Sequence, residues 1–118
     1  MTEETAQILH LERALAEALR APDPALGLAH LRAHGQLGPE LAARVAAIDD
    51  DGFRIAALLV ARLRFERLVQ GSTLASQWFD DDPASFAASF RRYHAEVTPT
   101  AQFPAGEAAL FAAWQAAQ

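Results

Sequence analysis

Proline and glycine divide this chain into short segments whose apolar residues recur with the period of an α-helix. Proline cannot continue the helical hydrogen-bond ladder, and glycine favours helix ends. In the first segment, for example, Leu11, Leu15 and Leu19 recur at four-residue steps and share one stripe. No segment shows the two-residue alternation of a half-buried strand. The pattern predicts an all-α fold of six or seven helices, separated at APDP (21–24), GQLGP (35–39), DDDG (49–52), GS (71–72), DP (82–83) and TP (98–99).

The segment from Phe53 to Val69 is the most apolar of the predicted helices. Ile55, Leu58 and Leu63 point in several directions around a helix, which is typical of a helix surrounded by others. A chain of 118 residues also lies in the usual size range of one domain, which buries about two-thirds of its unfolded surface. We therefore expect residues 1–118 to form a single compact bundle around this central helix.

Composition excludes several classes of function. The chain has no cysteine, which rules out disulfides, thiolate metal sites and a cysteine nucleophile. Its net charge of -5 disfavours binding to a phosphate backbone. The run IAALLVA (55–61) is far shorter than the roughly 20 residues of a membrane span, and the acidic N-terminus does not resemble an export signal. All ten cationic side chains are arginine, as in GC-rich bacterial genomes. A bacterial, cytoplasmic protein that binds neither nucleic acid nor membrane is expected.

The stretch WFDDDPASFAASFRRYH (78–94) combines three carboxylates, two arginines and a histidine, as a catalytic or metal-binding site would. Asp82 followed by Pro83, however, is a strong helix start, because the carboxylate accepts from open backbone amides while proline occupies the first turn. Twelve helical residues then separate Asp82 from His94, or about 18 Å. The spacing predicts a helix cap rather than a metal or catalytic centre.

His30 and His34 are the two candidate metal ligands in the sequence. Four residues apart on a predicted helix, they have the spacing that lets two imidazoles face one ion. A third ligand could come from His10 or from an acidic residue on another helix, but the sequence identifies none. The aspartates at 49–51 lack the glutamate that ends a calcium loop. We expect no cofactor and no metal.

The basic run RLRFER (62–67) is predicted to be a solvated helix end, with an anion or acidic-partner site as the alternative. The chain contains no glycine-rich phosphate loop, no nucleophile elbow and no plausible ordered set of serine, histidine and aspartate. We therefore expect that the protein is not an enzyme, although it could be the non-catalytic subunit of one.

Aromatic residues gather in the C-terminal part of the chain. Short helices do not easily bury so many rings, and exposed aromatics mark interfaces. An interaction surface is therefore expected in this half, with Trp78, Arg91, Arg92, Tyr93 and Trp114 as its partner-binding residues. Eight of the ten aromatics lie there: Trp78, Phe79, Phe86, Phe90, Tyr93, Phe103, Phe111 and Trp114.

The runs ARLRFERLVQGS (61–72) and SFAASFRRYHAEVTPTAQFP (85–104) resemble the small helical partner proteins that accompany multinuclear iron oxidases in ribosomal peptide natural-product pathways. In that family the enzyme subunit carries the iron ligands and the helical partner helps to hold the peptide substrate. The resemblance implies a binding role for Arg91, Arg92 and Tyr93 and no iron ligand in this chain.

The leading hypothesis is a helical, non-enzymatic adaptor that binds another protein or a peptide through its C-terminal face. Three alternatives stay open. They are a partner subunit of a peptide-modifying iron oxidase that helps to bind the precursor peptide, a toxin-neutralising immunity protein, and a histidine-based metal or haem binder.

Overall fold

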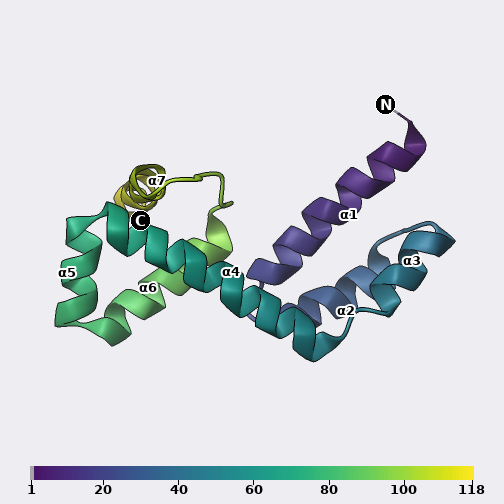
Figure 1. Cartoon of the computed structure of the whole chain (residues 1–118), viewed down its shortest axis with the longest axis horizontal. Coiled ribbons are helices and arrows are strands. Elements are labelled where there is room, and N and C mark those ends of the chain that lie inside the picture. The colour runs from purple at the N-terminus through teal and green to yellow at the C-terminus, as the bar shows by residue number, and fades with distance from the viewer. Residues whose placement is uncertain (1) are drawn as a thin grey trace. The chain divides into compact units, whose positions relative to one another are not determined.

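The computed structural model describes residues 2–118, and these residues form seven α-helices and no strand (Figure 1). The all-α fold predicted from the sequence is confirmed. The helices are α1 (Glu3–Arg20), α2 (Pro24–His34), α3 (Pro39–Ala46), α4 (Asp50–Gly71), α5 (Thr73–Asp81), α6 (Pro83–Glu96) and α7 (Pro104–Ala116). None of them, over the part of the chain described, combines the length and apolar character needed to cross a membrane.

Side-chain caps explain where several of the helices begin. The Asp82 carboxylate accepts from the Ser85 amide at 3.2 Å, and Pro83 occupies the first turn of α6. The cap predicted from the DDDP sequence is therefore confirmed. Ser72 caps α5 in the same way, through a 3.1 Å bond from the Ala75 amide. Each bond satisfies one of the backbone amides that a helix start leaves open.

The contacts divide the chain into two compact units, with the boundary between Leu59 and Val60 inside α4. The first unit comprises α1, α2, α3 and the beginning of α4. The second comprises the rest of α4 with α5, α6 and α7. A division by contacts does not show how the chain unfolds, so the expected single domain stays a prediction.

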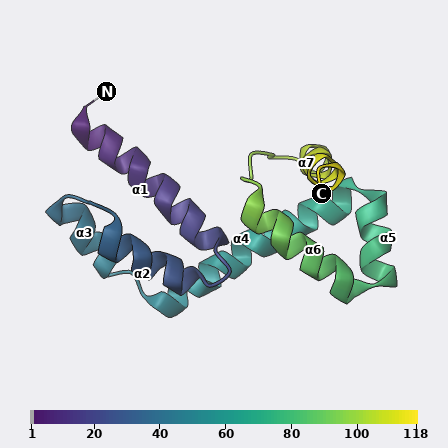
Figure 2. The ribbon, with the colours of Figure 1, turned by 180° about the vertical axis from the view of Figure 1, so that it is seen from behind.

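The core of the first unit is small and mainly aliphatic. Helices α1 and α2 supply most of its contacts, and α3 lies beside α2 in both views (Figures 1 and 2). Gly27 permits close packing of α1 on α2, because a Cβ there would lie 3.0 Å from the Ala18 Cα. The buried cluster consists of Ala18, Leu28, Leu31, Val45 and Phe53.

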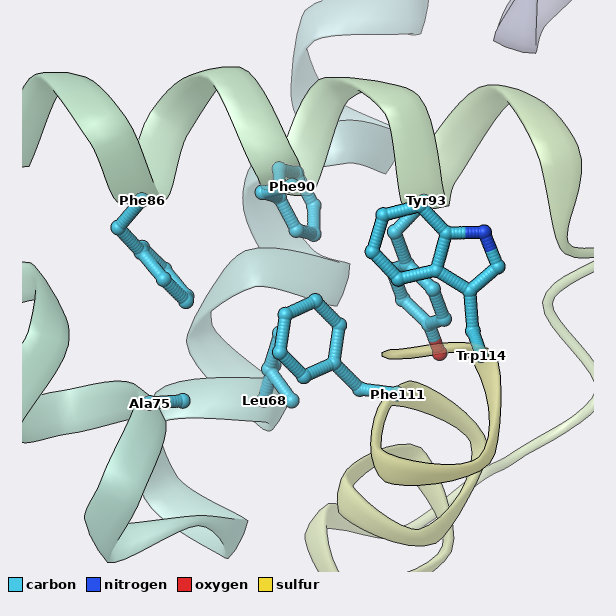
Figure 3. Close-up of a cluster of buried hydrophobic side chains, with 7 residues drawn as sticks. All are labelled: Leu68, Ala75, Phe86, Phe90, Tyr93, Phe111 and Trp114. Carbon is cyan, nitrogen blue, oxygen red and sulfur yellow. The ribbon is translucent and has the colours of Figure 1, made fainter. Parts of the chain in front are cut away.

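Aromatic rings fill the core of the second unit. Figure 3 shows Phe86, Phe90 and Tyr93 of α6 pointing toward Leu68 of α4 and toward the rings of α7. Most of the ring pairs meet edge to face, the arrangement that the quadrupole of an aromatic ring favours. The buried cluster consists of Leu68, Ala75, Phe86, Phe90, Tyr93, Phe111 and Trp114.

Helix α4 differs in two ways from the predicted central helix. It begins at Asp50, so the DDDG sequence starts the helix instead of interrupting it, and the Asp49 carboxylate accepts from the Gly52 amide at 2.8 Å. Its apolar residues are also less buried than predicted, since Ile55 is 59% and Leu58 70% exposed. The prediction of a helix surrounded on all sides was wrong, because an apolar residue at every angle does not by itself supply neighbours to cover it.

Candidate functional site

The predicted partner-binding residues divide into buried and exposed ones. Tyr93 is fully buried and Trp114 is 9% exposed, and both pack in the aromatic core of the second unit. Arg91 and Arg92 lie on the exposed side of α6, and Trp78 is half-buried on α5. Of these five residues, Arg91 and Arg92 are therefore accessible to a partner, and Trp78 is accessible in part.

Arg64 of α4 corrects the prediction that residues 62–67 form a solvated helix end. Its side chain is 0% exposed. The Nε atom donates to Glu107 Oε2 at 3.0 Å, and the Nη1 atom donates to the Val97 carbonyl at 2.6 Å. The guanidinium carbon lies 4.3 Å from the centroid of the Tyr93 ring. Arg64 thus joins α4 to α7 and to the C-terminal end of α6.

Glu107 is the buried carboxylate that balances Arg64, and it too is fully buried. The Tyr93 hydroxyl donates to its Oε2 atom, and the Arg67 guanidinium lies 3.6 Å from its Oε1 atom. Burial, reinforced by the hydrogen bond to Glu107, raises the pKa of Tyr93 to about 12. The phenol is therefore neutral at physiological pH and serves as a hydrogen-bond donor.

His94 of α6 is buried and lies against Arg64. The Arg64 Nη1 atom lies 3.3 Å from His94 Nδ1. Because a guanidinium can only donate, a hydrogen bond between the two side chains requires Nδ1 to accept. The ring stacks on Phe90, with centroids 5.7 Å apart and planes 9° from parallel. This histidine is an internal part of the core.

On the surface above this core, Arg92 lies over the Trp114 ring, with its guanidinium carbon 5.5 Å from the ring centroid. Its Nη2 atom donates to the Gln118 side chain at 2.8 Å, and Gln118 in turn donates to the Trp114 carbonyl at 3.0 Å. Arg91 and Arg92 form no ion pair with a carboxylate among residues 2–118. We refer to Arg91 and Arg92 as the arginine face.

In the first unit the two candidate metal ligands are close together. The rings of His30 and His34 have centroids 4.7 Å apart. They line a pocket of about 310 Å³ whose other polar side chains, His10 and Glu17, come from α1. No three histidine, aspartate or glutamate side chains in residues 2–118 are arranged so that they could hold a metal ion together.

Sequence reasoning missed the Arg64–Glu107 pair because the partners are 43 residues apart and a helix cannot bring them together. One signal existed: Glu107 is the only charged residue between residues 97 and 118, in a run of alanine, leucine and aromatic residues. A lone carboxylate in such surroundings points to a buried, paired charge.

Comparison of the chain with protein-family models, with curated proteins and with solved structures finds no match.

Proposed function

We propose that the protein is a non-catalytic binding module whose arginine face holds an acidic or carboxylate-bearing segment of another protein or of a peptide. The observation that carries the proposal is the packing of Arg92 over Trp114. An arginine held over an aromatic ring loses little side-chain entropy on binding, and its planar fork fits a carboxylate with two parallel hydrogen bonds.

The neighbouring residues support the same conclusion. Arg91 is exposed beside Arg92 and has no carboxylate partner among residues 2–118, so its charge is available to a ligand. On α5, which packs against α6, Leu74 is 79% exposed and lies one helical turn from the half-buried Trp78. Arginine and tryptophan are enriched among the residues that carry most of the binding energy at protein interfaces. Tyr93 and Trp114 support this surface from the core and do not touch the partner.

A more specific form of the proposal makes the chain the partner subunit of a peptide-modifying iron oxidase, where the arginine face helps to bind the precursor peptide. This form rests on the resemblance of residues 61–72 and 85–104.

Two steps test the proposal. A photo-crosslinking residue at the exposed position Ala88, one turn from Arg91 and Arg92, is introduced into the tagged full chain in its native cells, and the crosslinked protein or peptide is identified. The same residue at the exposed position Ala42 of the first unit is the control. The identified partner is then titrated with the purified chain. We expect Arg91→Ala/Arg92→Ala to weaken binding by roughly 1 to 4 kcal/mol with an unchanged melting temperature.

Arg44→Ala is the matched control for this titration, because Arg44 is an exposed arginine of the first unit. If the double variant stays folded and binds as the wild type does, the arginine face is not the binding site. The exposed Arg62 of α4 is then the next position to substitute, while Arg64 is not, since it is buried.

A further inference from the structure

The histidines of the first unit differ from His94 of the second in having accessible nitrogen atoms. His10, His30 and His34 are all exposed, and none of them forms a hydrogen bond or an ion pair within residues 2–118. Neutral imidazole is the commonest protein ligand for divalent transition metals. The three rings line one pocket together with Glu17, so that donors from α1 face donors from α2.

The spacing of the His30 and His34 rings suits a shared ion. Metal–nitrogen bonds of about 2.0 to 2.1 Å place two adjacent imidazole ligands with their ring centroids about 4.5 to 5 Å apart. The observed separation is 4.7 Å, with the ring planes 45° apart. Both residues lie on α2 at positions i and i+4, so the helix backbone holds them on one face before any ion arrives.

We propose that His30 and His34 form a two-imidazole site for a divalent transition metal ion of the copper, nickel or zinc type. The remaining coordination positions face the pocket and are filled by water or by a small ligand. Two protein ligands are enough for such an open site, whereas the expectation of no metal rested on the lack of a third. The ion exchanges with solvent, so titration of the chain, and not metal content after purification, is the relevant measurement.

The test is a titration of the chelator-treated full chain with Cu²⁺, followed by calorimetry and by electron paramagnetic resonance. We expect one equivalent to bind with a signal from two nitrogen ligands. Removal of either imidazole should lower the affinity by roughly 10²-fold, because the second bond of a chelate forms within one molecule. His10→Ala should have a much smaller effect, since His10 does not belong to a three-ligand group.

The matched control is Ala29→His/His30→Ala, which keeps four histidines but separates the pair by five residues. Ala29 is exposed, so the change does not disturb the core. On a helix a spacing of five turns the two rings away from each other. This variant should bind Cu²⁺ as weakly as His30→Ala does. Wild-type affinity in the control would overturn the proposal, because the binding would then depend on the number of histidines and not on their geometry.

A second readout does not depend on variants. In the wild type, substoichiometric Cu²⁺ should broaden the imidazole proton resonances of His30 and His34 first, and leave those of His94 sharp. Broadening that begins at His10 or His94, or no broadening at one equivalent, would also overturn the proposal. Either result leaves the proposed role of the arginine face untouched, since the two sites lie in different units.

Discussion

The two units of this chain use arginine in the same way but in different surroundings. In the first unit, Arg32 donates to the carbonyls of Val45 and Ile48, at 3.3 and 2.5 Å, and pairs with Asp50 at 2.8 Å. It thereby joins the C-terminal end of α3 to the start of α4. In the second unit, Arg64 joins the end of α6 to α4 and α7. Both side chains donate to backbone carbonyls at or just beyond the C-terminal end of a helix.

The difference lies in exposure to water. The Arg32 side chain is 28% exposed and its carboxylate partner 51%, whereas Arg64 and Glu107 are both 0% exposed. An exposed charge that loses its partner is solvated again, but a buried one has no such compensation. The same kinds of bond should therefore contribute less to the stability of the first unit than to that of the second.

The largest effect is expected from Glu107→Ala. The substitution leaves the Arg64 guanidinium buried without its carboxylate, which costs about 3 to 5 kcal/mol of the free energy of unfolding. Urea denaturation followed by circular dichroism measures the loss, and near-ultraviolet dichroism reports on the aromatic core. Glu66→Ala is the control, because the Arg62–Glu66 pair is exposed and should contribute at most about 1 kcal/mol.

A second variant separates an unpaired charge from a loss of packing. Arg64→Met/Glu107→Leu removes both charges and keeps most of the volume, so it should be more stable than Glu107→Ala. If the double variant is the less stable of the two, the pair does more than cancel two buried charges. Its hydrogen bonds to Val97 and Tyr93 would then stabilise the second unit as well. If Glu107→Ala shifts one unfolding transition of the whole chain to lower urea concentration, the expectation of one domain is supported as well.

The next effect is a loss of stability at high pH through Tyr93. Its pKa rises from 10.0 to about 12 on folding, so the folded state favours the neutral phenol. This stabilisation is fully present below pH 10 and is lost as the pH rises through about 12, by about 2 to 3 kcal/mol in total. The measurement is clean, because the chain has one tyrosine, no cysteine and no lysine to titrate in that range.

Tyr93→Phe serves as the reference for this pH dependence. The variant lacks the ionisable group, so its stability should change little between pH 10 and 12 relative to its value at pH 9. A tyrosinate absorbance in the native wild type that titrates near pH 10 would contradict the prediction, and so would equal slopes for the two proteins.

Arg32→Ala tests the same bonds in the first unit. It removes two hydrogen bonds to backbone carbonyls and one ion pair, all partly exposed, so the expected loss is about 1 to 2 kcal/mol. Thermal and urea unfolding of this variant should be compared with those of Glu107→Ala. A loss as large as that of Glu107→Ala would show that exposure does not distinguish the two units.

How far the sequence predicts this molecule depends on whether a feature is local. The helix starts at Pro24, Pro39 and Pro83 follow from a few adjacent residues, and the structure confirms them. The histidine pair is local as well. The Arg64–Glu107 pair depends on packing between distant segments. The basic run 62–67 was therefore assigned to the surface, although Arg64 is buried in the core.

Burial of the aromatic residues was ambiguous for the same reason. A stripe of Phe86, Phe90 and Tyr93 at helical spacing fits a core and an interface equally well. Only the positions of α5 and α7 decide between the two, and they bury Tyr93 and Trp114 while leaving Arg91 and Arg92 exposed. Leu58 of α4 shows the opposite case, because an apolar residue on this helix is exposed where no other helix within residues 2–118 packs over it.

The smallest losses of stability are expected at the Asp-Pro helix start, which both units contain. Asp23 accepts from the Ala25 amide at 3.1 Å and begins α2, as Asp82 does for α6. Both carboxylates are near the protein surface, so the contrast between the units should disappear here. Replacing either aspartate by alanine is expected to cost about 1 kcal/mol of the free energy of unfolding. Asp80→Ala should cost less, because Asp80 lies within α5 and makes no cap bond. Urea denaturation of the three variants under one condition checks the order. Equal losses for Asp80→Ala and Asp82→Ala would mean that negative charge near the start of α6, rather than the hydrogen bond of its cap, stabilises the helix. In that case the loss should diminish as salt is added.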